Sequence, residues 1–202
     1  LSALFIVLSC SSTHQSNLEQ CLRTRAGIDI GSGSTKLKVY QVNTCNQTII
    51  KEVDPNKCSY SDKVAYKESL KNNNQITKTI LEEGLAVLNK MKHAAVNCGA
   101  NEFSATATPA FRQADNAKAA IQYLEKSGIK IHIISQEQEA ILGYNGGLSK
   151  SEDKSLCVWD IGGSSMQIIC PSKNEQYHLY LGHLASVPFK DHINQLKKSK
   201  RN

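Results

Sequence analysis

The chain has 202 residues, of which 40% are hydrophobic and 21% are charged, and it carries a net charge of +6. This length and composition can bury one good hydrophobic core or two small ones, so a folded protein is expected. Much of the positive excess lies in residues 190–201, where no aromatic residues alternate with the basic ones. A dedicated nucleic-acid surface is therefore not expected, whereas a phosphate-rich small polyanion would suit the charge.

Residues 1–20 are interpreted as a leader and tether, because an almost wholly apolar run precedes Cys10 and a polar stretch follows it. The run is too short for a membrane-spanning helix, which needs about 20 residues. It resembles the end of a bacterial lipoprotein signal, in which the Cys10 thiol receives the lipid. We therefore expect export and a lipid anchor on the periplasmic side of the cell envelope. The alternative is a buried N-terminal helix or strand, which would return the protein to the cytoplasm.

The next part of the chain predicts strands at residues 26–30 and 35–42, on either side of a Gly-Ser turn. A third strand is expected at 48–53 and a loop at 54–60. Apolar side chains then recur at helical spacing over residues 76–95, which predicts a helix with one face on the core.

Strands and helices alternate after that helix. The predicted elements are a strand at 102–107, a helix from 109 to 126, a strand at 129–134 and a helix at 135–144. Thr108 and Ser135 precede the two helices and are expected to cap them. The alternation indicates an α/β protein, with a first domain at 21–145 and a partial second domain at 146–202.

Two segments, 27–34 and 158–165, share one local pattern. In each, an apolar run ends in an aspartate, Asp29 or Asp160, and turns at once through glycine and serine. The glycines let backbone N–H groups approach phosphate oxygens, and each carboxylate can reach a cation directly or through water. The pair predicts one cleft in which both turns hold a metal-bound phosphate.

These motifs resemble the two phosphate motifs of the exopolyphosphatase and guanosine pentaphosphate phosphatase (Ppx/GppA) family, within the actin-like ATPase superfamily. Residues 105–116 and 133–140 resemble two further blocks of the same family, in the same order. The resemblance runs from residue 27 to 193 and implies a ribonuclease H-like domain plus the beginning of a second similar domain. Family members need more chain than this, so the second domain is expected to be cut short.

The resemblance implies a Mg²⁺-dependent phosphohydrolase acting on phosphoanhydrides. Glu139 would activate water, Arg112 would clamp a terminal phosphate, and Asp29 and Asp160 would hold Mg²⁺. Small or polar residues would contact phosphate, namely Gly31, Ser32, Gly33, Ser34, Asn116, Gly162, Gly163 and Ser164.

Each of these residues also has a purely structural interpretation. The two aspartates would cap turns, Arg112 would pair with Asp115 on its own helix, and Glu139 would be an acid favoured by the helix dipole. The chain also departs from the family pattern at four positions. The chain has Gln138 where the family usually has Glu, and Gln136 where it has Gly. It has Gly33 where the family has Asn, and Ser164 where it has a third Gly.

Seven cysteines are compatible with an oxidising compartment. If Cys10 is acylated, six remain to pair, and no spacing indicates zinc. Cys45 with Cys58 is the first expected bridge, because the two flank a polar loop. Cys157 and Cys170 bracket the second motif and would either bridge a hairpin or remain reduced.

Export would favour inorganic polyphosphate as substrate, whereas a cytoplasmic location would restore guanosine pentaphosphate as an equal candidate. The other hypotheses are a phosphate- or nucleotide-binding fragment without turnover, and an ATP-dependent kinase or actin-like ATPase. The blocks around Arg112 and Glu139 argue against the last of these. A homodimer is a further expectation.

Overall fold

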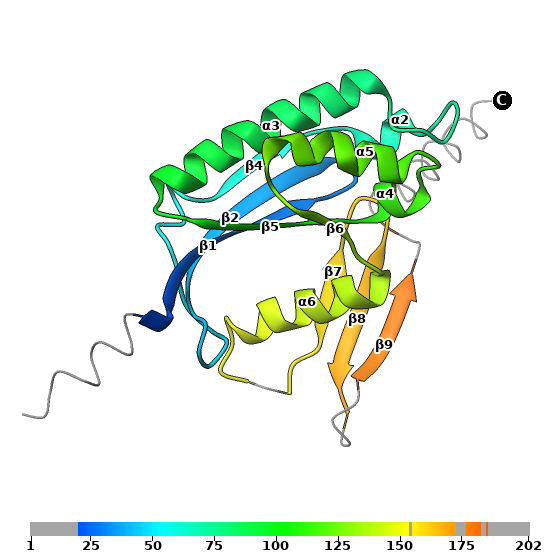
Figure 1. Cartoon of the computed structure of the whole chain (residues 1–202). Helices are drawn as coiled ribbons and strands as arrows, with labels where there is room; N and C mark the ends of the chain where they lie inside the picture. Colours follow the sequence, from blue (N-terminus) through cyan, green and yellow to red (C-terminus); the bar gives the residue numbers. More distant parts are fainter. Residues whose placement is uncertain (1–19, 154, 173–176, 183–184, 186–202) are drawn as a thin grey trace, which may run out of the picture.

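A computed structural model describes residues 20–153, 155–172, 177–182 and 185, which form two β-sheets with helices against them (Figure 1). The first sheet has six strands in the order β3-β2-β1-β5-β6, and β4 pairs with β2 as well. Its strands are β1 (Leu22–Ile30), β2 (Ser34–Asn43), β3 (Thr48–Glu52), β4 (Tyr60–Lys63), β5 (Glu102–Ala107) and β6 (Ile131–Ile133). The antiparallel β1–β2–β3 meander followed by parallel β5 and β6 is the ribonuclease H-like arrangement that was expected.

Helices cover one face of this sheet. They are α2 (Tyr66–Ser69), α3 (Lys78–Asn97), α4 (Pro109–Gln113) and α5 (Ala117–Leu124), and Figure 1 shows α3 and α5 lying along the same side of the strands. Side chains alternate along β1, so Ala26, Ile28 and Ile30 are buried against this layer. Asp29 therefore lies on the opposite, polar face, directly across from Lys36 of β2.

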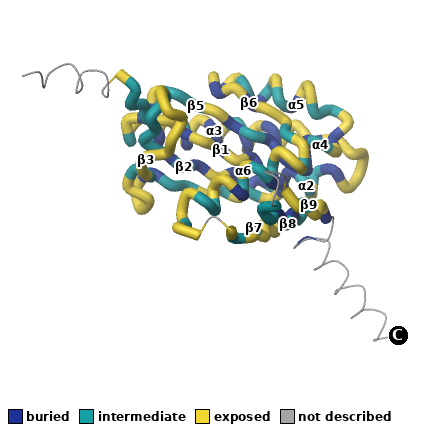
Figure 2. The backbone as a smooth tube through the Cα atoms, turned by 90° about the horizontal axis from the view of Figure 1, so that it is seen from below, coloured by how far each residue is buried: buried dark blue, intermediate teal, exposed yellow. Residues whose placement is uncertain are grey.

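The second unit consists of α6 (Gln136–Leu148) and an antiparallel sheet of β7 (Val158–Ile161), β8 (Met166–Pro171) and β9 (Tyr177–Gly182). Ala140 and Tyr144 of α6 form a small buried core with Ile169 of β8. The domain boundary expected at residue 145 would place most of α6 in the first domain, whereas the helix packs on the second sheet. The other face of this sheet carries exposed side chains, including Trp159 of β7, and Figure 2 shows exposed, intermediate and buried segments together in this part of the molecule.

Several predicted elements differ from those in the structure. The helix expected at 76–95 runs from Lys78 to Asn97, with the Thr77 hydroxyl accepting a hydrogen bond from the Ile80 amide. A strand, β4, begins at the end of the loop expected at 54–60. The helix expected at 109–126 is broken after Gln113, because Ala114 adopts an extended conformation.

The cause of this break is a tertiary contact. The Asn116 side chain accepts a hydrogen bond from the amide of Ile76 and donates one to its carbonyl, each at 2.9 Å. Thr108 occupies the N-cap position of α4 as expected, but its hydroxyl donates to the Ile30 carbonyl and makes no cap bond. Thr108 thus ties the start of α4 to β1, and Asn116 ties the start of α5 to the segment before α3.

The six described cysteines form three disulfides, Cys21–Cys45, Cys58–Cys98 and Cys157–Cys170. The bridge expected between Cys45 and Cys58 is therefore wrong. Cys45 lies near the β2–β3 turn beside the start of β1, whereas Cys58 faces the end of α3. The Cys157–Cys170 bridge across the β7–β8 hairpin is confirmed.

The interpreted leader, including Cys10, lies outside the described residues, as does nearly all of the chain after residue 182. The proposed tether at 11–20 falls outside them too, except for its last residue. Among the helices that the structure does describe, none has the length and apolar character needed to cross a membrane.

We expect Gly84→Ala to destabilise the protein by about 1 to 3 kcal/mol, because a methyl group there would overlap the hydroxyl of buried Tyr66. Helix propensity alone would favour alanine. The matched control is Gly146→Ala on α6, where a Cβ meets nothing within 4 Å, and it should stabilise by up to about 1 kcal/mol. Urea denaturation of both variants tests the contact, and equal shifts would contradict it.

Replacing Cys58 and Cys98 together with alanine should lower the free energy of unfolding by about 4 kcal/mol, as the chain-entropy estimate for residues 40 apart gives. The reason is that the bridge restrains the unfolded chain between β4 and the end of α3. Thermal melting with and without reductant measures the effect. If neither the reductant nor the substitution changes the melting temperature, the bridge does not form.

Candidate functional site

The two aspartate-glycine-serine turns have the same local geometry. After β1, the Gly31 amide donates to the Ser34 carbonyl at 2.9 Å, and after β7 the Gly162 amide donates to the Ser165 carbonyl at 2.9 Å. A Cβ at Gly31 would lie 3.0 Å from the Ser34 oxygen, and one at Gly162 would lie 3.2 Å from the Ser165 oxygen. A side chain at either position would be crowded by a carbonyl of its own turn, so glycine is favoured in both turns.

Both turns face one cavity of about 430 Å³, which lies between the two sheets. Asp29 and Asp160 line it from opposite units, together with Gly31 and Gly162. The expectation that the two motifs share a cleft is therefore confirmed. We call this cavity the cleft.

Glu139 also lines the cleft and comes from a third element, the first turn of α6. The Ser135 side chain accepts from the amide of Gln138, and the Gln138 side chain accepts from the amide of Ser135, so a capping box fixes the start of the helix. Gly143 is one turn further along the same helix, and a Cβ there would lie 3.6 Å from Oδ2 of Asp160. Glu139 and Asp160 therefore lie on the same side of the cleft.

Burial, with a smaller contribution from neighbouring negative charges, raises the pKa of two of the three carboxyls, those of Asp29 and Glu139. The pKa of Asp29 is raised, mainly by removal from bulk solvent, while Lys36 opposes the rise and the charge of Asp160 adds to it. The pKa of Glu139 is raised mainly by burial, against the effect of Arg112, with smaller contributions from Asp29 and Asp160. The cleft thus concentrates negative charge, which is costly until a cation enters.

Arg112 supports Glu139 and does not line the cleft. Its guanidinium donates to Oε2 of Glu139 at 2.9 Å and to the Ile134 carbonyl at 2.8 Å. The alternative pairing with Asp115 is therefore not formed, since Asp115 accepts from Asn74. The expected clamp on a terminal phosphate stays a prediction, because in this structure the guanidinium orients the glutamate.

The predicted phosphate-binding residues divide into groups. The residues that line the cleft are Gly31, Ser32, Gly33, Ser34, Gly162 and Gly163, and the amides of Gly31 and Gly162 also close their own turns. The hydroxyls of Ser32 and Ser164 are buried and have no hydrogen-bond partner among the described residues. Buried hydroxyls without partners are unfavourable, so both serines are suited to a ligand that accepts hydrogen bonds.

Three predicted site residues, Arg112, Asn116 and Ser164, do not line the cleft, and other residues that line it were not predicted. Asn116 does not line the cleft, because both polar atoms of its side chain bind the Ile76 backbone. Lys36, Thr108 and Ser165 line it but were not predicted as ligand contacts. Lys36 could have been found by pairing the strands of the first hairpin, because residues that flank the turn symmetrically face the same side.

Two departures from the family pattern have structural roles here. Gln138 completes the capping box, a task that glutamine and glutamate both perform, so no charge is lost from the cleft. The Gln136 side chain donates to the carbonyls of Met166 and Gly182, at 3.2 and 3.0 Å. A glycine at this position could not tie α6 to β8 and β9.

The donor set of the cleft fits a hard divalent cation. Among the described residues, no group of at least three acidic, histidine or cysteine side chains converges closely enough to enclose a metal alone. Mg²⁺ does not need such a cage, because it usually keeps several waters and binds one or two carboxylates together with substrate phosphates. Asp29 and Asp160 at the two turns are suited to this partial coordination.

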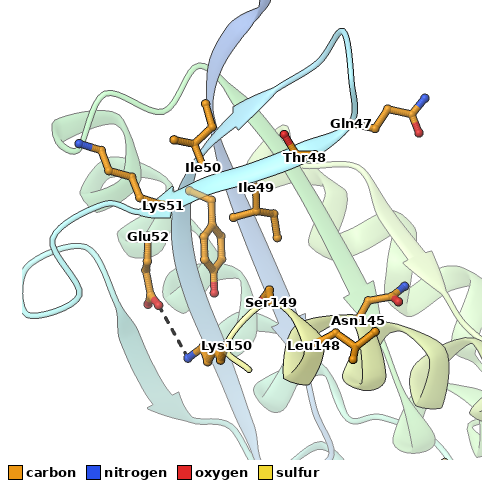
Figure 3. A pocket seen from close by; sticks show the side chains of 11 residues that line it. Gln47, Thr48, Ile49, Ile50, Lys51, Glu52, Asn145, Leu148, Ser149 and Lys150 are labelled. Atoms are coloured by element: carbon orange, nitrogen blue, oxygen red, sulfur yellow. Dashed lines mark ion pairs between the residues drawn. The ribbon is translucent and has the colours of Figure 1, made fainter. Parts of the chain in front are cut away.

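A larger cavity, of about 530 Å³, lies between β3 and the end of α6 (Figure 3). The one acidic side chain in its lining, Glu52, is already paired, since it lies 4.0 Å from Lys150 and accepts a hydrogen bond from Lys38. Neither aspartate turn reaches it. We therefore assign the functional site to the cleft, although its volume is smaller.

Comparison with known proteins agrees with this fold. The model of the Ppx/GppA phosphatase family matches residues 49–180, so the chain belongs to that family. No curated protein sequence matches the chain.

Solved structures share the fold at low sequence identity. A Ppx/GppA family member from Aquifex aeolicus aligns with a TM-score of 0.67 and 22% identity, over 84% of this chain and 54% of its own. An exopolyphosphatase from Cytophaga hutchinsonii gives 0.67 and 21%, over 84% and 53%. An exopolyphosphatase-like protein gives 0.72 and 21%, over 85% and 54%. The chain thus spans about half the length of these proteins.

We expect the Glu139 carboxyl to titrate at higher pH in Arg112→Gln than in the unmodified protein, because a nearby positive charge and hydrogen bond that favour the ionised form are lost. Carbon NMR of the side-chain carboxyl measures this. Arg25→Gln is the control, since it breaks an arginine–glutamate pair with Glu102 outside the cleft. A Glu139 titration unmoved by Arg112→Gln would contradict the pairing.

Proposed function

We propose that this chain forms the cleft of a Mg²⁺-dependent phosphohydrolase that releases terminal phosphate from inorganic polyphosphate. The observation that carries the proposal is the single cleft lined by Asp29, Asp160 and Glu139, with a glycine-serine turn on each side. Membership of the Ppx/GppA phosphatase family supports the reaction class. Because the chain spans about half of the solved relatives, its activity belongs to the proposal and not to the family assignment.

Charge is the argument for the metal. The cleft places three carboxylates against a single lysine, Lys36, so an incoming polyphosphate would be repelled. Bound Mg²⁺ would offset this charge and polarise the phosphoryl group. Asp29 and Asp160 would hold it, directly or through water.

In the proposed step, water attacks the terminal phosphorus and the bond to the bridging oxygen breaks. Glu139 accepts the proton of the water, and the electron pair leaves with the shortened polymer. The raised pKa of Glu139 suits a base that must hold this proton. Arg112 is a positioning residue that orients the accepting oxygen, and the amides and hydroxyls of the two turns contact the transferred phosphoryl group.

The proposed location outside the cytoplasm favours polyphosphate as the substrate. The leader with Cys10 and the three disulfides are features of exported proteins, so we place the protein on the periplasmic side of the envelope with a lipid anchor. Guanosine pentaphosphate is a cytoplasmic signal, and it becomes the preferred substrate if the leader is not a signal. The half-length match keeps a binding fragment without turnover as the second candidate.

The test is phosphate release from long-chain polyphosphate with Mg²⁺. We expect Glu139→Gln to lower kcat by about 100-fold or more, because a general base typically contributes that much. Glu137→Gln is the matched control, since Glu137 lies in the same first turn of α6 but is exposed. Chelation with EDTA should abolish release in all three proteins, and added Mg²⁺ should restore it in the active ones.

The alternatives give different results. Release from guanosine pentaphosphate but not from polyphosphate would assign the nucleotide as substrate. If polyphosphate binds but neither the unmodified protein nor Glu139→Gln releases phosphate, the chain binds phosphate without turnover.

A further inference from the structure

A second pocket, of about 500 Å³, adjoins the cleft on the far side of the two turns. Ser32, Gly33 and Gly163 line both cavities, so the turns form a shared wall between them. The rest of the pocket comes from the end of β4, from α2 and from α3. A ligand longer than one phosphate could therefore reach from the cleft past the turns into this pocket.

The charge of the pocket is opposite to that of the cleft. Lys63, Lys67 and Lys71 line it, spaced four residues apart, against two glutamates, Glu68 and Glu83. Within the described part of the chain, none of the three lysines forms an ion pair, and Lys67 donates a hydrogen bond to the neutral Gln113 side chain. The lysine charges are thus available to an anion.

The two unpartnered serines point to the same ligand chemistry. Ser32 is 5% exposed and Ser164 is 7% exposed, and both line this pocket. Their hydroxyls have no partner among the described residues, and the backbone amides of Gly163 and Ser164 likewise donate to no described acceptor. Phosphate oxygens, each of which accepts hydrogen bonds, would satisfy these donors.

We propose that this pocket is a second subsite, in which the lysines and buried serines hold the phosphate units that follow the terminal one in a linear polyphosphate. This inference rests on the proposed function and extends it to the length of the substrate. The acidic cleft receives the metal-bound end, and the basic pocket neutralises the next part of the same chain.

The lining favours an inorganic chain over a guanosine nucleotide. None of the side chains that form the pocket is aromatic, and Ala65 is the only apolar one. A guanine base would find no ring on which to stack, whereas repeated phosphates would meet three lysines.

The experiment compares the affinities of tripolyphosphate and long-chain polyphosphate, with Mg²⁺, in a Glu139→Gln background so that the polymer is not consumed. Lys63→Gln with Lys71→Gln should weaken long-chain binding about tenfold and tripolyphosphate binding much less. The slope of log Kd against log salt for the long chain should fall by roughly 1.4, as for two lost phosphate contacts on a single strand. The control, Lys78→Gln with Lys118→Gln, removes equal charge from exposed positions on α3 and α5.

Circular dichroism establishes that each variant is folded before binding is compared. The subsite is overturned if long-chain affinity does not change, if both lengths lose affinity equally, or if the control behaves like the Lys63 and Lys71 variant. It is also overturned if single-stranded DNA displaces polyphosphate as well as polyphosphate itself does. Selective loss of long-chain binding supports the subsite even if the unmodified protein releases no phosphate, so failure of the hydrolase proposal is distinguishable.

Discussion

The crowding of three carboxylates in one cleft is the constraint on which the site depends. Asp29, Glu139 and Asp160 come from β1, α6 and β7, three elements that are far apart in the sequence. Folding buries these groups near one another, and burial first, with the neighbouring negative charges second, raises the pKa values of Asp29 and Glu139. A protein retains such an arrangement at a cost in stability, and at functional sites the cost is offset when a ligand supplies the missing charge.

Much of the local structure could be predicted from the sequence. The strand at 102–107, the capped start of α6 and the two aspartate turns followed from periodicity, capping residues and glycine placement. These features depend on residues that are close together in the chain. The shared cleft was also predicted, although only because two similar motifs suggested a joint ligand.

The features that the sequence did not reveal depend on contacts between distant residues. The break between α4 and α5 follows from Asn116 binding Ile76, and no local signal marks that partner. Disulfide pairing likewise depends on which strand and helix ends meet, so Cys58 with Cys98 could not be chosen by proximity in the chain. The sequence also did not show that α6 packs on the second sheet. That contact depends on Ala140 and Tyr144, on one side of the helix, meeting Ile169 of β8.

The contact between Arg112 and Glu139 also joins the two units, because Arg112 belongs to α4 of the first and Glu139 to α6 of the second. A proton on the glutamate removes the negative charge that attracts the guanidinium. Protonation of Glu139 therefore weakens a contact between the two units of the fold. In the proposed hydrolysis the same proton would also occupy the oxygen that has to accept one from water, so a fall in pH would act on the reaction and on this inter-unit contact together.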